Sequence, residues 1–100
     1  MITEAELLEH KWRKVDDKCW EKLGVRIEYP IALTEFTAIK IIYYHHSTRS
    51  TYSAISVPAT ISITALEAVI RTQVKYIFKL GPQKFPMTPK QKRTLKNWIL

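Results

Sequence analysis

The chain has 100 residues, of which 46% are hydrophobic and 25% charged, and its formal net charge is +7 at pH 7. This length predicts one domain over residues 1–100, and the composition excludes an intrinsically disordered protein. No stretch reaches the roughly 18 consecutive apolar residues of a membrane-spanning helix, and the acidic beginning Met1–Glu6 is unlike a secretory leader. The single cysteine, Cys19, excludes an internal disulfide, so we expect a soluble protein in a reducing, cytoplasmic compartment.

A short helix is expected first. Thr3 stands three residues before Glu6, which is the spacing of a capping box, in which the hydroxyl and the carboxylate each accept a backbone amide of the first turn. The pattern predicts a helix over Glu4–Lys11, with Leu7 and Leu8 as its apolar contacts.

The next segment predicts a hairpin. Val25–Tyr29 alternates apolar with charged residues, as a half-buried strand does. Lys18–Lys22 precedes it as the partner strand, because Leu23–Gly24 between them supplies a residue that tolerates positive φ. Asp16–Asp17 indicates an earlier turn.

Two longer strands follow. Phe36–His46 is rich in β-branched and aromatic residues, and Thr51–Val57 is expected to pair back with it across the turn Ser47–Ser50. Pro30 and Pro58 mark the ends of two strands, because proline cannot donate to a ladder. We therefore expect three or four antiparallel strands.

Two helices complete the chain. Thr64 and Thr88 repeat the capping-box spacing, and Pro89 suits the first position of a helix. A long helix is predicted over Ala65–Leu80, ended by Gly81–Pro82, and a short one after Thr88. The fold class is α+β: a short N-terminal helix, a three- to four-stranded antiparallel sheet, one long amphipathic helix packed on it, and a short C-terminal helix.

Charge is divided unevenly along the chain. Residues 1–67 contain all nine acids and eight Lys or Arg, whereas residues 68–100 contain eight cations and no acid. A folded domain gains nothing from such self-repulsion, so the pattern indicates a positive surface for an anionic partner.

The long helix shows how this surface would form. Leu66, Ile70, Val74 and Ile77 share one apolar stripe that is expected to face the sheet. Arg71, Lys75 and Lys79 follow at four-residue spacing as a ridge pointing away from the core, with only Glu67 in reach of Arg71. A solvated helix face is the ordinary alternative for such a ridge and has about equal weight here.

The terminal helix repeats the arrangement, with Leu95, Trp98 and Ile99 on an apolar side and cations on another. We predict a non-enzymatic module that binds nucleic acid or a nucleoprotein complex, because Lys and Arg near phosphates release counterions. The alternative is an inhibitor or assembly factor, either monomeric or homodimeric, that binds an acidic protein surface. The predicted contacts are Arg71, Lys75, Lys79, Lys92, Arg93 and Lys96.

Aromatic rings offer a secondary contact. Tyr44, His46 and Tyr52 lie near a predicted turn, and flat rings are what single-stranded bases stack on. Packing within the sheet is the more common role of such residues.

Catalytic and metal sites find little support. The adjacent His45 and His46 would point to opposite faces of a strand, and Cys19 and His10 show no paired ligand spacing. No glycine-rich phosphate loop or nucleophile motif is present. We predict no cofactor, no metal and no enzymatic activity, although a nuclease with scattered carboxylates stays open.

The order of elements resembles that of small uncharacterised proteins of phages and other mobile elements. The resemblance spans roughly residues 5–80 and rests on Trp12–Lys22 and on Ser62–Glu67, which opens the long helix. It implies a compact, non-enzymatic binding protein, in a group that includes anti-CRISPR inhibitors of host defence acting in the host cytosol. Many such inhibitors are acidic mimics of nucleic acid, so this basic chain would instead contact a guide RNA, a target strand or an acidic groove.

Overall fold

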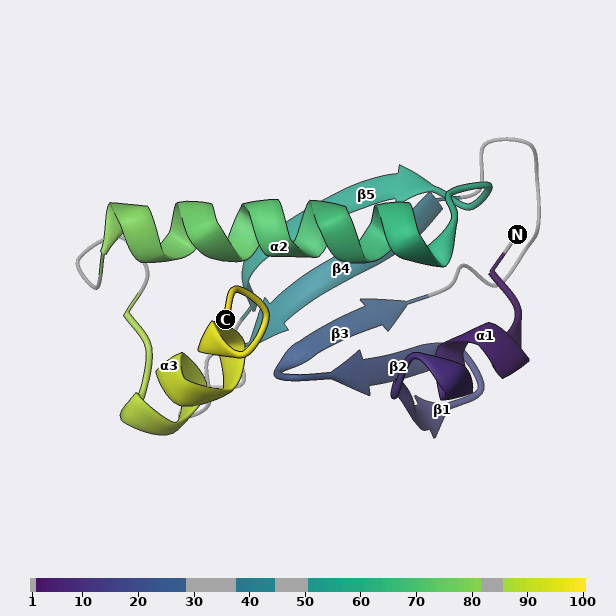
Figure 1. The fold of residues 1–100 in the computed structure, drawn as a ribbon, viewed down its shortest axis with the longest axis horizontal. Coiled ribbons are helices and arrows are strands. Elements are labelled where there is room, and N and C mark those ends of the chain that lie inside the picture. Colours follow the sequence, from purple (N-terminus) through teal and green to yellow (C-terminus); the bar gives the residue numbers. More distant parts are fainter. Residues whose placement is uncertain (1, 29–37, 45–50, 82–85) are drawn as a thin grey trace.

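A computed structural model describes residues 2–28, 38–44, 51–81 and 86–100 of the chain (Figure 1). It confirms the α+β class, with five described strands in place of the expected three or four. In chain order the elements are α1 (Glu4–Glu9), β1 (Arg13–Asp16), β2 (Cys19–Lys22), β3 (Val25–Glu28), β4 (Ala38–Tyr44), β5 (Thr51–Pro58), α2 (Ile63–Leu80) and α3 (Pro89–Lys96).

The five strands form one antiparallel sheet in the order β1-β2-β3-β4-β5, and the three helices lie over one of its faces (Figure 1). In β3 the alternation is as predicted: Val25 and Ile27 are fully buried on the helix side, while Arg26 and Glu28 on the other side are half-buried. The buried face continues from β3 to β4, because the strand register pairs Ile27 with Ile41 of β4.

Strand β1 is the one that the pattern did not predict. All four of its residues are exposed, so it has no alternation of buried and exposed positions. Its pairing with β2 is held by the turn between them, in which an oxygen of Asp16 accepts hydrogen bonds from the backbone amides of Lys18 and Cys19 at 2.8 and 2.9 Å. These hydrogen bonds lower the pKa of Asp16, and the bond from the Lys18 amide has the largest effect.

The predicted turn at Leu23–Gly24 joins β2 and β3, and both residues have positive φ, 48° and 80°. A Cβ at Gly24 would lie 3.3 Å from the Cγ2 atom of Thr94, so α3 packs closely on this turn. The indole of Trp98 adds a hydrogen bond from Nε1 to the Leu23 carbonyl oxygen at 3.1 Å. The β2–β3 hairpin therefore packs directly against α3 and the segment that follows it.

The first capping box is confirmed in full. The hydroxyl of Thr3 accepts the Glu6 amide, and the Glu6 carboxylate accepts the Thr3 amide. Helix α1 ends at Glu9 instead of Lys11, and Leu8, expected to be an apolar contact, is 59% exposed.

The second box is wrong. Helix α2 begins two residues earlier than predicted, with Ser62 as its N-cap, because the Ser62 hydroxyl accepts the Ala65 amide at 3.1 Å. Thr64 is exposed within the first turn, and Glu67 is engaged elsewhere. The helix ends as predicted, at Gly81.

The third box is half formed. The Thr88 hydroxyl accepts the Gln91 amide at 3.1 Å, and Pro89 occupies the first turn as predicted. The buried Oε1 atom of Gln91 makes no hydrogen bond among the described residues, so the reciprocal bond to the cap is missing.

A single hydrophobic cluster fills the space between the sheet and the helices. Trp12, which follows α1, lies against Trp98 of the C-terminal segment with ring centroids 5.9 Å apart. Of the described helices, none is long and apolar enough to cross a membrane.

Candidate nucleic-acid interface

Helix α2 divides its surface between the core and solvent as predicted. Leu66, Ile70, Val74 and Ile77 are each no more than 3% exposed and pack in the core. The predicted ridge residues Arg71, Lys75 and Lys79 are all exposed. Because the three side chains recur every four residues, they occupy one flank of the helix.

Helix α3 presents its charges in a similar way. Lys92, Arg93 and Lys96 are exposed, while Leu95 on the other side of the helix and Trp98 just after it are 1% and 3% exposed. Lys90 in the first turn is exposed as well. The burial of Leu95 and Trp98 fixes which side of the helix faces the sheet, so the cations face outward.

None of the seven described cations of residues 68–100 lies within ion-pair distance of a carboxylate of the described residues. The ion pairs of the described residues instead connect the elements that precede α2 with one another or with Glu67. Lys14 of β1, for example, lies 3.2 Å from Glu4 of α1. The carboxylates that form ion pairs among the described residues thus do so with cations that precede α2, and no described cation of residues 68–100 takes part in these pairs.

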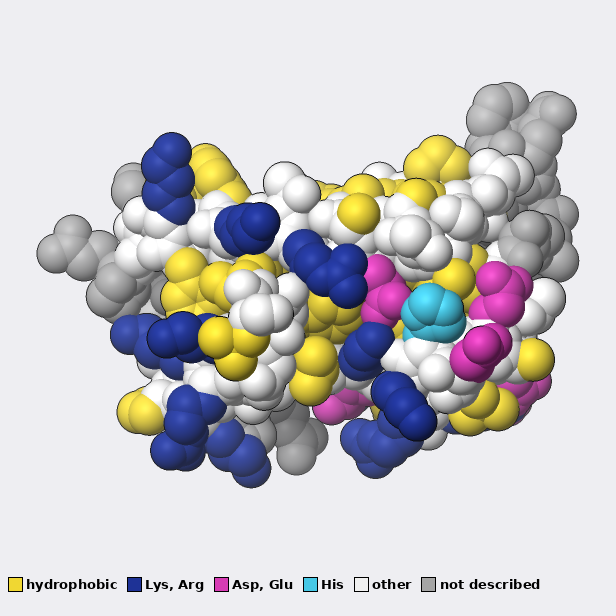
Figure 2. Space-filling view, viewed as in Figure 1, with side chains coloured by type: hydrophobic (Ala, Val, Ile, Leu, Met, Phe, Trp, Pro, Cys, Tyr) yellow, Lys and Arg dark blue, Asp and Glu magenta, His cyan; other side chains and the backbone are white. Residues whose placement is uncertain are grey.

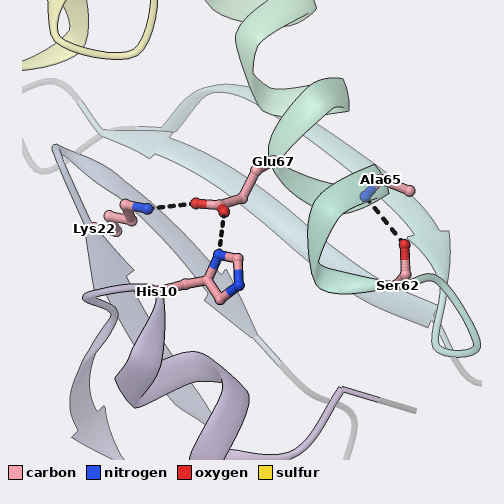
Figure 3. A network of polar contacts seen from close by, with 5 residues as sticks. All are labelled: His10, Lys22, Ser62, Ala65 and Glu67. Atoms are coloured by element: carbon pink, nitrogen blue, oxygen red, sulfur yellow. Dashed lines mark hydrogen bonds and ion pairs between the residues drawn. The ribbon is translucent and has the colours of Figure 1, made fainter.

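Glu67 does not balance Arg71 as the helical spacing predicted. Its carboxylate, 4% exposed, turns toward the sheet, where one oxygen lies 2.7 Å from Nδ1 of His10 and the other accepts a hydrogen bond from Nζ of Lys22 (Figure 3). Burial alone would raise the pKa of Glu67, but the hydrogen bonds from Lys22 and His10 outweigh it and lower that pKa. Glu67 is therefore a buried anion that joins α2 to α1 and β2.

Lys22 extends this cluster to α3. Its Nζ atom, besides binding Glu67, lies 5.2 Å from the centroid of the Trp98 ring, within the range of a cation–π contact. The side chain of Lys22 thus lies between the carboxylate of α2 and the indole that follows α3. These contacts of Lys22 help to fix the position of α3 relative to α2.

The surface view shows the result (Figure 2). Lys and Arg side chains run along the front of α2 and gather over α3, whereas Asp and Glu side chains on this face lie mainly toward α1. Sequence reasoning named six cations as candidate contacts, and all six are exposed. It missed Lys90 as a member of the group and the cluster around Glu67, whose partners lie 45 and 57 residues away in the sequence.

The stacking candidates cannot be joined to this surface. His46 lies outside the described residues, as do His45 and Lys84, and only the backbone of Tyr44 and Tyr52 is described. The Cα of Tyr44 pairs with that of Thr51, beside an irregularity in the ladder.

Reactive groups are sparse among the residues that the structure describes. No group of three or more His, Cys, Asp or Glu side chains there could hold a metal ion. The Cys19 thiol is 8% exposed, and burial raises its pKa, which disfavours the nucleophilic thiolate.

Comparison with known proteins adds no relative. No protein family matches the chain, and no significant match is found among curated proteins or solved structures.

Proposed function

We propose that the chain binds nucleic acid through the phosphate backbone, using the cations of α2 and α3. The observation that carries the proposal is that every described cation of residues 68–100 is exposed and has no carboxylate partner within the described part of the chain. Solvated helix faces normally mix charges of both signs, whereas this surface carries one sign only. The residues proposed to contact phosphates are Arg71, Lys75, Lys79, Lys92, Arg93 and Lys96.

The spacing of the ridge suits an extended polyanion. Residues four apart on a helix rise about 6 Å along its axis, so Arg71, Lys75 and Lys79 cover about 12 Å. Long cationic side chains at this spacing reach several phosphates of one strand without contacting bases. The expected binding is therefore weakly sequence-dependent and strongly salt-dependent.

The affinity for duplex DNA, single-stranded DNA and RNA should be measured by fluorescence anisotropy across a salt series. Six phosphate contacts predict a slope of log K against log salt of about −5 for duplex and about −4 for single strands. The absence of binding at low salt to all three ligands would overturn the proposal.

Two variants that lose the same number of charges distinguish binding through the α2–α3 surface from binding that depends only on net charge. Replacing Arg71, Lys75 and Lys79 by Gln removes three charges from the ridge and should reduce the duplex slope by about 3. The control replaces Lys11, Lys18 and Lys40 by Gln, which are exposed cations outside α2 and α3. Equal losses in the two variants would show that binding follows net charge and not the α2–α3 surface.

The proposal extends to a nucleoprotein target, as the resemblance to phage proteins implies, with inhibition of a host-defence complex as its biological outcome. Affinity purification with and without nuclease treatment distinguishes the cases. A partner protein retained after nuclease treatment supports a nucleoprotein or protein target, whereas loss of all partners supports nucleic acid alone.

A further inference from the structure

The two edges of the sheet differ in how they are protected. Strand β1 carries Arg13, Lys14 and Asp16 and has an irregular register between Lys14 and Asp16, which are features that prevent edge-to-edge pairing. Strand β5 has eight residues, Thr51–Pro58, none of them charged. No described residue pairs with its outer edge, so its outward N–H and C=O groups form a template for another strand.

The flank of α2 beside this edge is uncharged. Val69, Gln73, Tyr76 and Leu80 follow one another at spacings of four, three and four residues, so they share one stripe. Tyr76 is 54% exposed and Leu80 is 36% exposed. Glu67 on the opposite flank points toward β2, which places the stripe on the side of β5, where Figure 2 shows hydrophobic side chains along the upper margin of the helix.

We propose that a second copy of this chain pairs with the β5 edge in antiparallel fashion, forming a two-fold dimer with a continuous ten-stranded sheet and with the two α2 stripes in contact. Antiparallel pairing of a strand with its own copy is self-complementary, as a two-fold interface requires.

Charge favours this edge over the rest of the surface for a contact between two copies. Two copies that each carry a net charge of +7 repel one another, so a stable contact between them needs a surface without cations. The β5 edge and the Val69–Leu80 stripe meet this condition, and the ridge of Arg71, Lys75 and Lys79 stays on the other flank of α2. The dimer therefore leaves both cationic surfaces free, and its existence does not depend on nucleic-acid binding.

Sedimentation equilibrium over a range of protein concentrations tests the dimer, with Tyr76→Lys as the interface variant and Leu8→Lys as the control. Leu8 is 59% exposed on α1, far along the chain from the stripe, and its replacement adds the same charge. The wild type and the control should dimerise equally, whereas Tyr76→Lys should weaken dimerisation by roughly tenfold or more, as loss of an aromatic anchor does. A monomeric wild type, or equal effects of the two variants, would overturn the proposal.

Cysteine cross-linking tests the strand pairing itself. In a Cys19→Ser background, single cysteines at Ser53, Ala54 and Ser56 place a thiol along β5. Near the two-fold axis the opposed Cα atoms of paired strands are about 4.5–5.5 Å apart, within disulfide range. At least one variant should form a dimer disulfide rapidly. Dimers in solution without any such cross-link would place the interface elsewhere, and cross-linking to a foreign strand peptide but not to the chain itself would reject the second copy as the occupant.

Discussion

Replacing Glu67 by Gln is the sharpest test of the buried cluster. The substitution preserves shape, but the amide keeps only one acceptor oxygen and turns an N–H₂ group toward the other donor. One charge-assisted hydrogen bond, worth about 1.5–3 kcal/mol, is lost, and the other becomes weaker. Lys22 and His10 are 17% and 34% exposed, so water recovers part of the loss.

We therefore expect Glu67→Gln to lower the free energy of unfolding by about 2–3 kcal/mol at pH 7. For a domain of this size each kcal/mol lowers Tm by about 4 °C, so Tm should fall by about 8–12 °C. Urea unfolding followed by tryptophan fluorescence measures the change. The control is Glu9→Gln, an exposed residue of α1 that should alter stability by less than about 0.5 kcal/mol.

The pH dependence of the stability difference between wild type and Glu67→Gln provides a second test of the cluster. The pKa of Glu67 in the folded state lies below its ordinary value of 4.5, so below pH 4.5 the unfolded chain binds more protons at this group. Its contribution is complete above pH 4.5 and is lost as the pH falls through the folded-state pKa. The difference in stability between wild type and Glu67→Gln should therefore shrink below pH 4.5. A difference below about 0.5 kcal/mol at pH 7, or one that stays constant down to pH 3, would refute the reasoning.

The remaining predictions concern a cap, two glycines and the cysteine. Ser62→Ala should lower stability by about 1 kcal/mol and Thr64→Ala by less than about 0.5, measured by urea unfolding; the reverse order would restore the original capping-box assignment. Gly24→Ala should cost about 2 kcal/mol, because a positive φ is combined with a close contact to α3. Gly81→Ala should cost about 1–3 kcal/mol without any close contact, because φ of 81° and ψ of 177° form a backbone conformation that is essentially restricted to glycine. Cys19 should react with a thiol reagent far more slowly in the native protein than in urea; equal rates would show that it is not buried.

Local patterns predicted the fold where a residue's neighbours in sequence decide its structure. The alternation in Val25–Glu28 identified β3, and Gly24, a residue that tolerates positive φ, identified its hairpin. Strand β1 was not predicted, because all of its residues are exposed and its sequence therefore shows no alternation of apolar and polar residues. Its structure depends on the Asp16 turn and on pairing with β2, and neither is a periodic signal.

The error at the start of α2 has the same origin as the missed cluster. Ser62 and Thr64 are both acceptable caps, and the spacing to Glu67 favoured Thr64. That choice assumed that the carboxylate reaches back to the helix start. In the structure Lys22 and His10 engage it instead, so contacts between distant segments decide where the helix begins.

Glu67 also connects the stability of the fold with the proposed function. It is the last acidic residue of the sequence and therefore the one nearest in sequence to Arg71, the first residue of the cationic ridge. Because its carboxylate is buried against β2 and α1, it stabilises the packing of α2 and forms its ion pairs with Lys22 and His10 instead of Arg71. A variant that freed this carboxylate to reach Arg71 would weaken the fold and reduce the positive surface together, so the effects of Glu67 variants on nucleic-acid binding are to be compared only at equal fractions of folded protein.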